Sequence, residues 1–260
     1  MEIFGLAAIT ALVASLAIAW SARRLTPAKG SGYFIVPCAV AIGFFAGYAA
    51  LPRDWAGFIP AANQRWQWLP YGGLMAALFA VGCPPAPKSQ AWKFAVIAAA
   101  PIAAAYLTPN WPVLGLAREK LRWILLIYLM LVGVPLQYLP ARVVNRVLLG
   151  VLAAAAALAA VATGAMVSSK LAQLAAIAAG ALAGSWIAGR FSTKRGGLPG
   201  QSVIPVYAVV VGGLAWSACV EPDPPQLGLL AIPLIPLVLW FIPLVSRVKT
   251  VGQDEALTPS

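Results

Sequence analysis

Long hydrophobic stretches recur along the whole chain, and only short loops separate them. A helix needs about 20 mainly apolar residues to cross a hydrocarbon layer about 30 Å thick, and each stretch comes close to that length. The pattern predicts an all-α, polytopic helical membrane protein with about nine transmembrane helices. The predicted spans are Ile3–Trp20, Tyr33–Leu51, Trp66–Cys83, Ala91–Leu107, Leu121–Tyr138, Val147–Met166, Leu171–Ala188, Val203–Val220 and Leu227–Val245.

Composition leaves little room for a domain in water. Hydrophobic residues make up 62% of the chain and charged residues only 10%, whereas a soluble domain carries roughly 25% charged residues. We therefore expect a single transmembrane bundle over residues 1–249. The polar segment 250–260 is expected to be a disordered cytoplasmic tail.

The positive charges predict how the bundle is oriented. Lys and Arg are retained in cytoplasmic loops during insertion. With the N-terminus outside, twelve of the 18 basic residues fall on the cytoplasmic side, namely Arg23, Arg24, Lys29, Lys88, Lys93, Arg142, Arg146, Arg190, Lys194, Arg195, Arg247 and Lys249. The sequence thus predicts an external N-terminus, a cytoplasmic C-terminus and a multi-pass location in the cell (inner) membrane. The net charge of +11 needs no nucleic-acid partner to explain it.

Residue types that carry chemistry are scarce. The chain has no histidine, and Cys38, Cys83 and Cys219 lack the spacing of a metal site. All seven acids lie in loops, at helix ends or in the tail, at Glu2, Asp54, Glu119, Glu221, Asp223, Asp254 and Glu255. An acid at mid-depth would be the default sign of ion coupling or intramembrane catalysis. We therefore expect no catalytic site, no metal site and no cofactor, and three free thiols.

Two glycine patterns predict close helix packing. Gly43 and Gly47 form one GxxxG motif, and Gly180 and Gly184 form another. Small residues at this spacing let two helix backbones approach each other inside a membrane. Packing within the bundle is favoured over dimerisation.

A basic cluster opens the fifth predicted span. Arg118, Lys120 and Arg122 surround Glu119. On the predicted topology they lie at the outer membrane surface, where they would contact anionic headgroups of the lipid bilayer. If the protein were an enzyme for a lipid-linked substrate, Glu119 would be the only nearby base, and its conversion to Gln should abolish activity.

Three functions remain open at this stage. The lack of histidine and of acidic residues within the predicted spans favours a non-enzymatic structural, accessory or assembly component of a membrane complex, with other membrane protein subunits as partners. A permease for a small or apolar solute is the alternative, motivated by helices interrupted by Gly and Pro. Kinks are expected at Pro233, Pro236 and Pro243; they favour a fit to a curved bundle surface, and gating of a pathway is the alternative. The lipid-linked enzyme ranks third.

Overall fold

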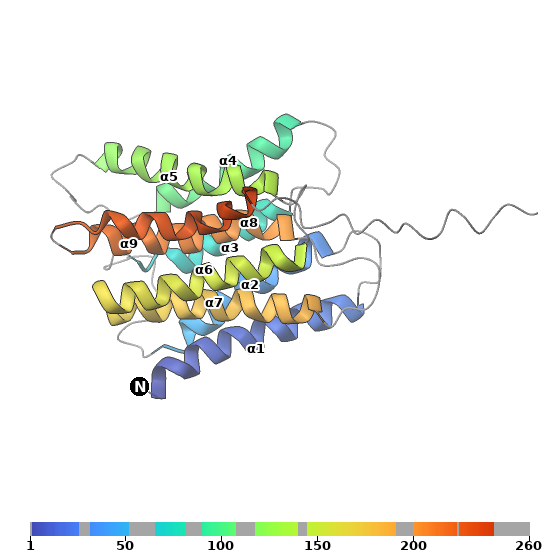
Figure 1. Ribbon diagram of the computed structural model, residues 1–260. Coiled ribbons are helices and arrows are strands. Elements are labelled where there is room, and N and C mark those ends of the chain that lie inside the picture. The colour runs from blue at the N-terminus through green and yellow to red at the C-terminus, as the bar shows by residue number, and fades with distance from the viewer. Residues whose placement is uncertain are drawn as a thin grey trace, which may run out of the picture.

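The structure is a computed structural model that describes residues 2–25, 32–51, 66–81, 90–107, 118–139, 145–190, 200–222 and 224–241. Every regular element in these ranges is helical, and the helices lie roughly side by side in an elongated bundle (Figure 1). The helices are α1 (Glu2–Leu25), α2 (Gly32–Ala49), α3 (Leu69–Val81), α4 (Gln90–Leu107), α5 (Arg118–Tyr138), α6 (Asn145–Met166), α7 (Ser169–Arg190), α8 (Ile204–Tyr207) and α9 (Gly213–Val220). Cys83, Pro243 and the predicted tail 250–260 lie outside the described residues.

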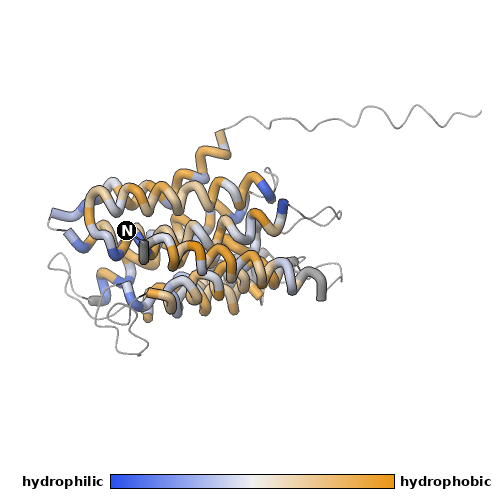
Figure 2. The backbone as a smooth tube through the Cα atoms, turned by 90° about the horizontal axis from the view of Figure 1, so that it is seen from below, coloured by the Kyte–Doolittle hydropathy of each residue, from blue (hydrophilic) through white to orange (hydrophobic). Residues whose placement is uncertain are grey.

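Four of the described helices are long and apolar enough to cross a membrane. They contain the windows Gly5–Ala22, Glu119–Tyr138, Arg146–Met166 and Ser169–Arg190, and shorter apolar helices pack among them. Figure 2 shows hydrophobic residues along the middle of the bundle and hydrophilic residues gathered towards its two ends. Length, composition and this distribution are those of a helical membrane protein.

Helix α1 packs against two helices that present glycines to it. A Cβ added at Gly43 of α2 would lie 2.9 Å from the carbonyl oxygen of Ala11, and one added at Gly47 would lie 2.8 Å from that of Ala7. These distances are shorter than real Cβ atoms show, so only glycine fits. Residue numbers rise along α2 as they fall along α1, which makes the two helices antiparallel.

Helix α7 approaches the adjacent face of α1 in the same manner. A Cβ added at Gly180 would lie 2.5 Å from the carbonyl oxygen of Ala8, and one at Gly184 would collide with the carbonyl oxygen of Leu12. Here the numbers rise together, so α1 and α7 run parallel. Both GxxxG motifs therefore meet the same helix, and α1, α2 and α7 form a unit with backbones in direct contact.

A hydroxyl pair joins α1 to α7 inside this unit. Ser15 and Ser185 are both fully buried, and their Oγ atoms lie 2.9 Å apart. Ser15 Oγ donates to the carbonyl oxygen of Ala181 at 2.7 Å. Because a serine has one hydroxyl hydrogen, Ser185 must donate to Ser15. Weakly polar side chains within membrane spans often bond to neighbouring helices in this way.

The predicted eighth span is one continuous buried helix of mixed geometry. A short 3₁₀ turn, η2 (Gly200–Val203), leads into α8; the π-helical segment η3 (Ala208–Gly212) follows, and α9 completes the helix. Trp216 is the one residue from 202 to 220 that is not buried. This helix therefore forms the centre of the second half of the bundle.

Helix α3 fits against this central helix through paired glycines. Positions 72 and 73 face Val209 and Val210, while Gly213 faces the side chains of Trp68 and Leu69. Trp66 and Trp68 precede α3 in a turn and are only 4% and 3% exposed. Tryptophans near the ends of apolar spans often lie in the lipid headgroup layer, but these two rings lie inside the bundle, where Trp68 packs against the glycines. Trp20 and Trp123 are exposed, as anchors should be.

The first prediction concerns the contact between α1 and α7. Gly180→Ala should lower the free energy of unfolding by about 1–3 kcal/mol, because the new methyl group has no space against the α1 backbone. The matched control is Gly5→Ala, since nothing lies within 4 Å of a Cβ at Gly5. Alanine favours helix over glycine by about 1 kcal/mol, so the control should be neutral or stabilising. Thermal unfolding in a mild detergent measures both. Equal melting temperatures for the two variants would contradict the close approach of α7 to α1.

Candidate functional site

The ninth predicted span departs most from regular helix. Leu227–Trp240 forms a 3₁₀ helix, η4, fourteen residues long, whereas such helices rarely exceed 3–4 residues. At about 2.0 Å per residue this segment spans about 28 Å, which approaches the hydrocarbon thickness of about 30 Å. An α-helix of the same residues would span about 21 Å. Instead of the kinks expected at Pro233 and Pro236, the whole segment has a tighter and longer winding.

The proline spacing determines which carbonyl oxygens of η4 lack a backbone hydrogen-bond donor. In a 3₁₀ helix each carbonyl oxygen accepts a hydrogen bond from the N–H three residues later. The residue three after Leu230 is Pro233, and the residue three after Pro233 is Pro236. Proline has no N–H. The carbonyl oxygens of Leu230 and Pro233 therefore lose their backbone partners, which is costly where water is absent.

Two tyrosines from other helices bind these same two oxygens. Tyr128 of α5 donates its hydroxyl hydrogen to the carbonyl oxygen of Leu230 at 3.1 Å. Tyr207, at the end of α8, donates to the carbonyl oxygen of Pro233 at 3.2 Å. In α-helical winding the two prolines would leave Leu229 and Ile232 unpaired instead. The tyrosines thus match the 3₁₀ pattern and stabilise it.

The surroundings hold this arrangement in the interior. The segment η4 contacts α5, α6, α9 and η3, and its buried residues are Leu229, Pro233 and Pro236. Tyr207 is 1% exposed and Tyr128 is 8% exposed. The ring of Tyr128 also lies 6.2 Å from that of Trp216 on α9. The 3₁₀ helix, the π segment and two hydroxyls therefore meet at one place, which we call the proline–tyrosine site.

The described residues of the proline–tyrosine site supply hydrogen-bonding groups but no carboxylate, amine or imidazole. Nearby in the sequence of the central helix, Ser217 is buried and its Oγ has no partner among the described atoms. Among the described residues there is also no group of three or more His, Cys, Asp or Glu side chains that could hold a metal ion. The site therefore consists of two irregular helical segments, η3 and η4, and a hydrogen bond from Tyr207 joins them.

The predicted headgroup cluster is only partly described. Lys120 is exposed at the start of α5, and nothing is described of the Arg118 side chain. Arg122 turns towards the end of α4: its Nη2 lies 3.5 Å from the carbonyl oxygen of Tyr106, and its guanidinium carbon lies 5.2 Å from the centre of the Tyr106 ring. Arg122 therefore contacts α4, and the headgroup contact predicted for Arg118, Lys120 and Arg122 stays a prediction.

Sequence reasoning missed Tyr128 and Tyr207. The prolines were recognised as helix breakers, but the number of carbonyl oxygens they leave unpaired was not followed further. Two prolines three residues apart create a need for two donors, and a tyrosine within a neighbouring apolar span is long enough to supply one. The proline spacing is visible in the sequence, but it does not identify which tyrosines donate the hydrogen bonds.

Comparisons of the chain with protein-family models, with curated proteins and with solved structures give no match.

The second prediction tests whether the tyrosine hydroxyl replaces the missing N–H. Tyr207→Phe should lower the free energy of unfolding by about 1–2 kcal/mol, because the carbonyl oxygen of Pro233 loses its donor. In a Pro236→Ala background the same change should cost much less, since residue 236 then has an N–H for that oxygen. Thermal unfolding of the four proteins in this double-mutant cycle measures the coupling.

Tyr138→Phe is the matched control, because Tyr138 is 53% exposed. It should leave the unfolding temperature unchanged. A Tyr207→Phe penalty of the same size in both backgrounds would show that the hydroxyl does not act as the substitute donor.

Proposed function

We propose that this protein is a non-enzymatic structural, accessory or assembly component of a membrane complex. In this proposal it crosses the cell (inner) membrane about nine times, with its N-terminus outside and its C-terminus in the cytoplasm. Its role is to contribute packed helices to an assembly with other membrane protein subunits.

The observation that carries the proposal is the character of the interior. The buried polar side chains of the described residues are all uncharged: Ser15, Gln67, Thr163, Gln173, Ser185, Ser202 and Ser217. Coupled transport and intramembrane catalysis usually depend on an ionisable group inside the membrane. The bonds of Ser15 instead join one helix to another. Such an interior stabilises a fixed arrangement of helices.

The tight unit of α1, α2 and α7 supports the same role. Its glycine contacts allow no side chain between the backbones, and packed interfaces of this kind resist continuous deformation. The parallel course of α1 and α7 also agrees with the proposed topology, because the first and seventh spans of a polytopic protein cross in the same direction.

Apolar faces on two helices offer surface to a partner subunit. Trp123, Ile127 and Leu131 of α5 follow one another at four-residue spacing and are 55–65% exposed. Leu6, Ile9 and Val13 of α1 lie three and four residues apart and are 53–60% exposed. Lipid or another helix would cover such faces in a membrane.

A permease for a small or apolar solute is the second candidate, and the proline–tyrosine site favours it. π-helical segments occur often at functional sites, and transporter sites form where helices are irregular near the middle of the membrane. Here η3 and η4 are both irregular, and Tyr207 links them. In that case the central helix would become accessible to solute in one state.

The third prediction tests the accessory role. Purified in a mild detergent, the tagged protein should carry reproducible, stoichiometric protein partners in its native mass spectrum, and a harsh detergent should remove them. Partner-free protein in every gentle detergent would overturn the proposal. Ile127→Trp and Val13→Trp then locate the contact, because each alters one exposed face and serves as the control for the other.

The fourth prediction separates the two candidates and checks the topology. We consider single cysteines placed in a background with Cys38, Cys83 and Cys219 changed to Ala. Lys120→Cys should react with a membrane-impermeant maleimide added to intact cells, and Arg190→Cys should react only after the membrane is opened. Ser217→Cys should remain unlabelled in both, since it lies in a packed interior. Labelling of residue 217 would favour the permease, and reversed labelling of 120 and 190 would contradict the orientation.

A further inference from the structure

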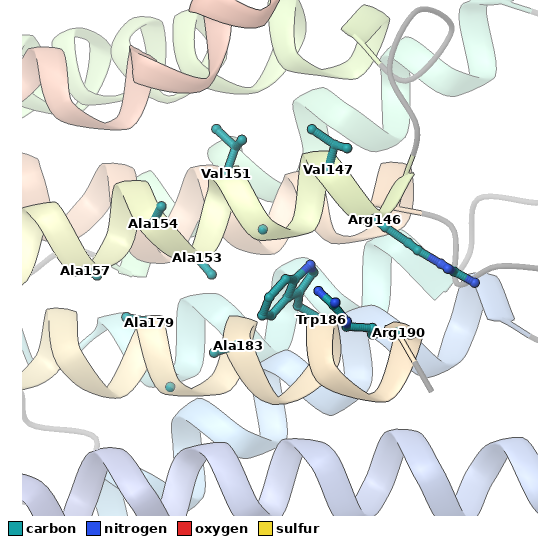
Figure 3. A pocket seen from close by; sticks show the side chains of 12 residues that line it. Arg146, Val147, Val151, Ala153, Ala154, Ala157, Ala179, Ala183, Trp186 and Arg190 are labelled. Atoms are coloured by element: carbon teal, nitrogen blue, oxygen red, sulfur yellow. The ribbon is translucent and has the colours of Figure 1, made fainter. Parts of the chain in front are cut away.

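A groove runs along the outside of the bundle between α6 and α7. Its volume is about 720 Å³, within the range of about 300–1,000 Å³ typical of ligand pockets. Figure 3 shows that side chains from both helices line it and that two arginines stand at the same end. The lining residues are Arg146, Val147, Gly150, Val151, Ala153, Ala154, Ala157, Ala179, Gly180, Ala183, Trp186 and Arg190.

The groove has a closed end and a charged end. The two helices meet at the tight turn of Val167 and Ser168, and there a Cβ at Gly164 would lie 3.2 Å from Cβ of Ala172. Towards the other end the indole of Trp186 lies between the helices, 3.2 Å from a Cβ at Gly150 (Figure 3). Small residues between these points leave the space unfilled.

The length of the groove matches one leaflet of a bilayer. From Arg146 to Ala157 on α6, and from Ala179 to Arg190 on α7, the chain rises about 16 Å at 1.5 Å per residue. Half of a hydrocarbon layer about 30 Å thick is about 15 Å. The groove thus runs from a membrane surface, marked by the arginines, to the middle of the membrane.

The charged end of the groove is positive, and the lining contains no acidic residue. Arg146 is the second residue of α6, so the positive end of that helix dipole adds to its field. Arg190 ends α7, and its guanidinium carbon lies 5.9 Å from the ring centre of Trp186. This contact orients the arginine at the groove. Basic pockets between membrane helices are where anionic headgroups bind.

We propose that the groove between α6 and α7 binds one anionic phospholipid from the leaflet on the side of Arg146 and Arg190. The phosphate lies at the end of the groove where the two arginines stand, and an acyl chain lies along the floor of Ala, Gly and Val residues. This goes beyond the accessory role and does not depend on it.

A transmembrane helix fits the groove less well than a lipid. A crossing helix would need a continuous surface over both leaflets. Val161 lies seven residues after Ala154, on the same face of α6, and is 69% exposed. Its side chain stands out where the groove has already ended, so the cavity offers space over one leaflet only.

The fifth prediction measures lipid retention. The purified protein is reconstituted in vesicles of equal phosphatidylglycerol and phosphatidylcholine, released in mild detergent and weighed by native mass spectrometry. One retained phosphatidylglycerol is expected. The double variant Arg146→Gln, Arg190→Gln should lose this preference by about fivefold for each arginine. The charge-conserving Arg146→Lys, Arg190→Lys protein should keep most of it.

The groove itself is tested with a matched pair of substitutions on α6. Ala154→Phe fills the groove and should abolish retention of the lipid. Ala165→Phe lies on the same helix at an exposed position outside the lining, so retention should persist. Thermal unfolding confirms that both variants are folded.

Three outcomes overturn the proposal: equal retention of both lipids by the unaltered protein, a phosphatidylglycerol preference that survives in the Gln variant, or a dimer that Ala154→Phe converts to monomer without changing lipid retention. The last would identify the groove as a contact between two copies. Because all arms use the purified protein alone, a failure here is distinct from a failure to find protein partners.

Discussion

Backbone hydrogen bonding in surroundings without water is the constraint on which this structure depends. Helices satisfy it locally, since each carbonyl oxygen finds an N–H in its own segment. Pro233 and Pro236 break that rule in η4, because they leave two carbonyl oxygens without donors. Tyr128 and Tyr207 supply the missing hydrogens from two other helices. The winding of η4 therefore depends on its place in the bundle, because the 3₁₀ helix is stabilised only where both tyrosine hydroxyls reach it.

The bundle uses two different ways of holding helices together. Around α1, glycines of α2 and α7 bring backbones into contact, and the Ser15–Ser185 pair adds hydrogen bonds across the interface. Around η4, long aromatic side chains reach across to carbonyl oxygens. The first arrangement depends on many short contacts and leaves little freedom. The second depends on two hydroxyl groups that replace backbone donors missing from η4.

The functional proposals rest on a difference between the interior and the surface of the bundle. The described interior contains hydroxyl and amide groups but no buried ionisable side chain of the Asp, Glu, Lys or Arg type, which favours a role in assembly. Charge gathers at the ends of the helices, where Arg146 and Arg190 stand at the mouth of the groove and Arg122 contacts the end of α4. Lipid recognition at the surface is compatible with either an accessory subunit or a permease, because it needs nothing from the interior.

The all-helical class, the order of most apolar segments and the two small-residue motifs were determined by the sequence itself. Hydropathy over a segment is a local property, so it requires no knowledge of neighbours. The structure alone decided that Gly43, Gly47, Gly180 and Gly184 all meet α1, that Trp66 and Trp68 are buried, and that η4 is 3₁₀ with Tyr128 and Tyr207 as its donors. Each of these depends on which segments lie side by side. Apolar helices resemble one another in composition, so the choice of partner is made by shape and by unpaired backbone groups in three dimensions.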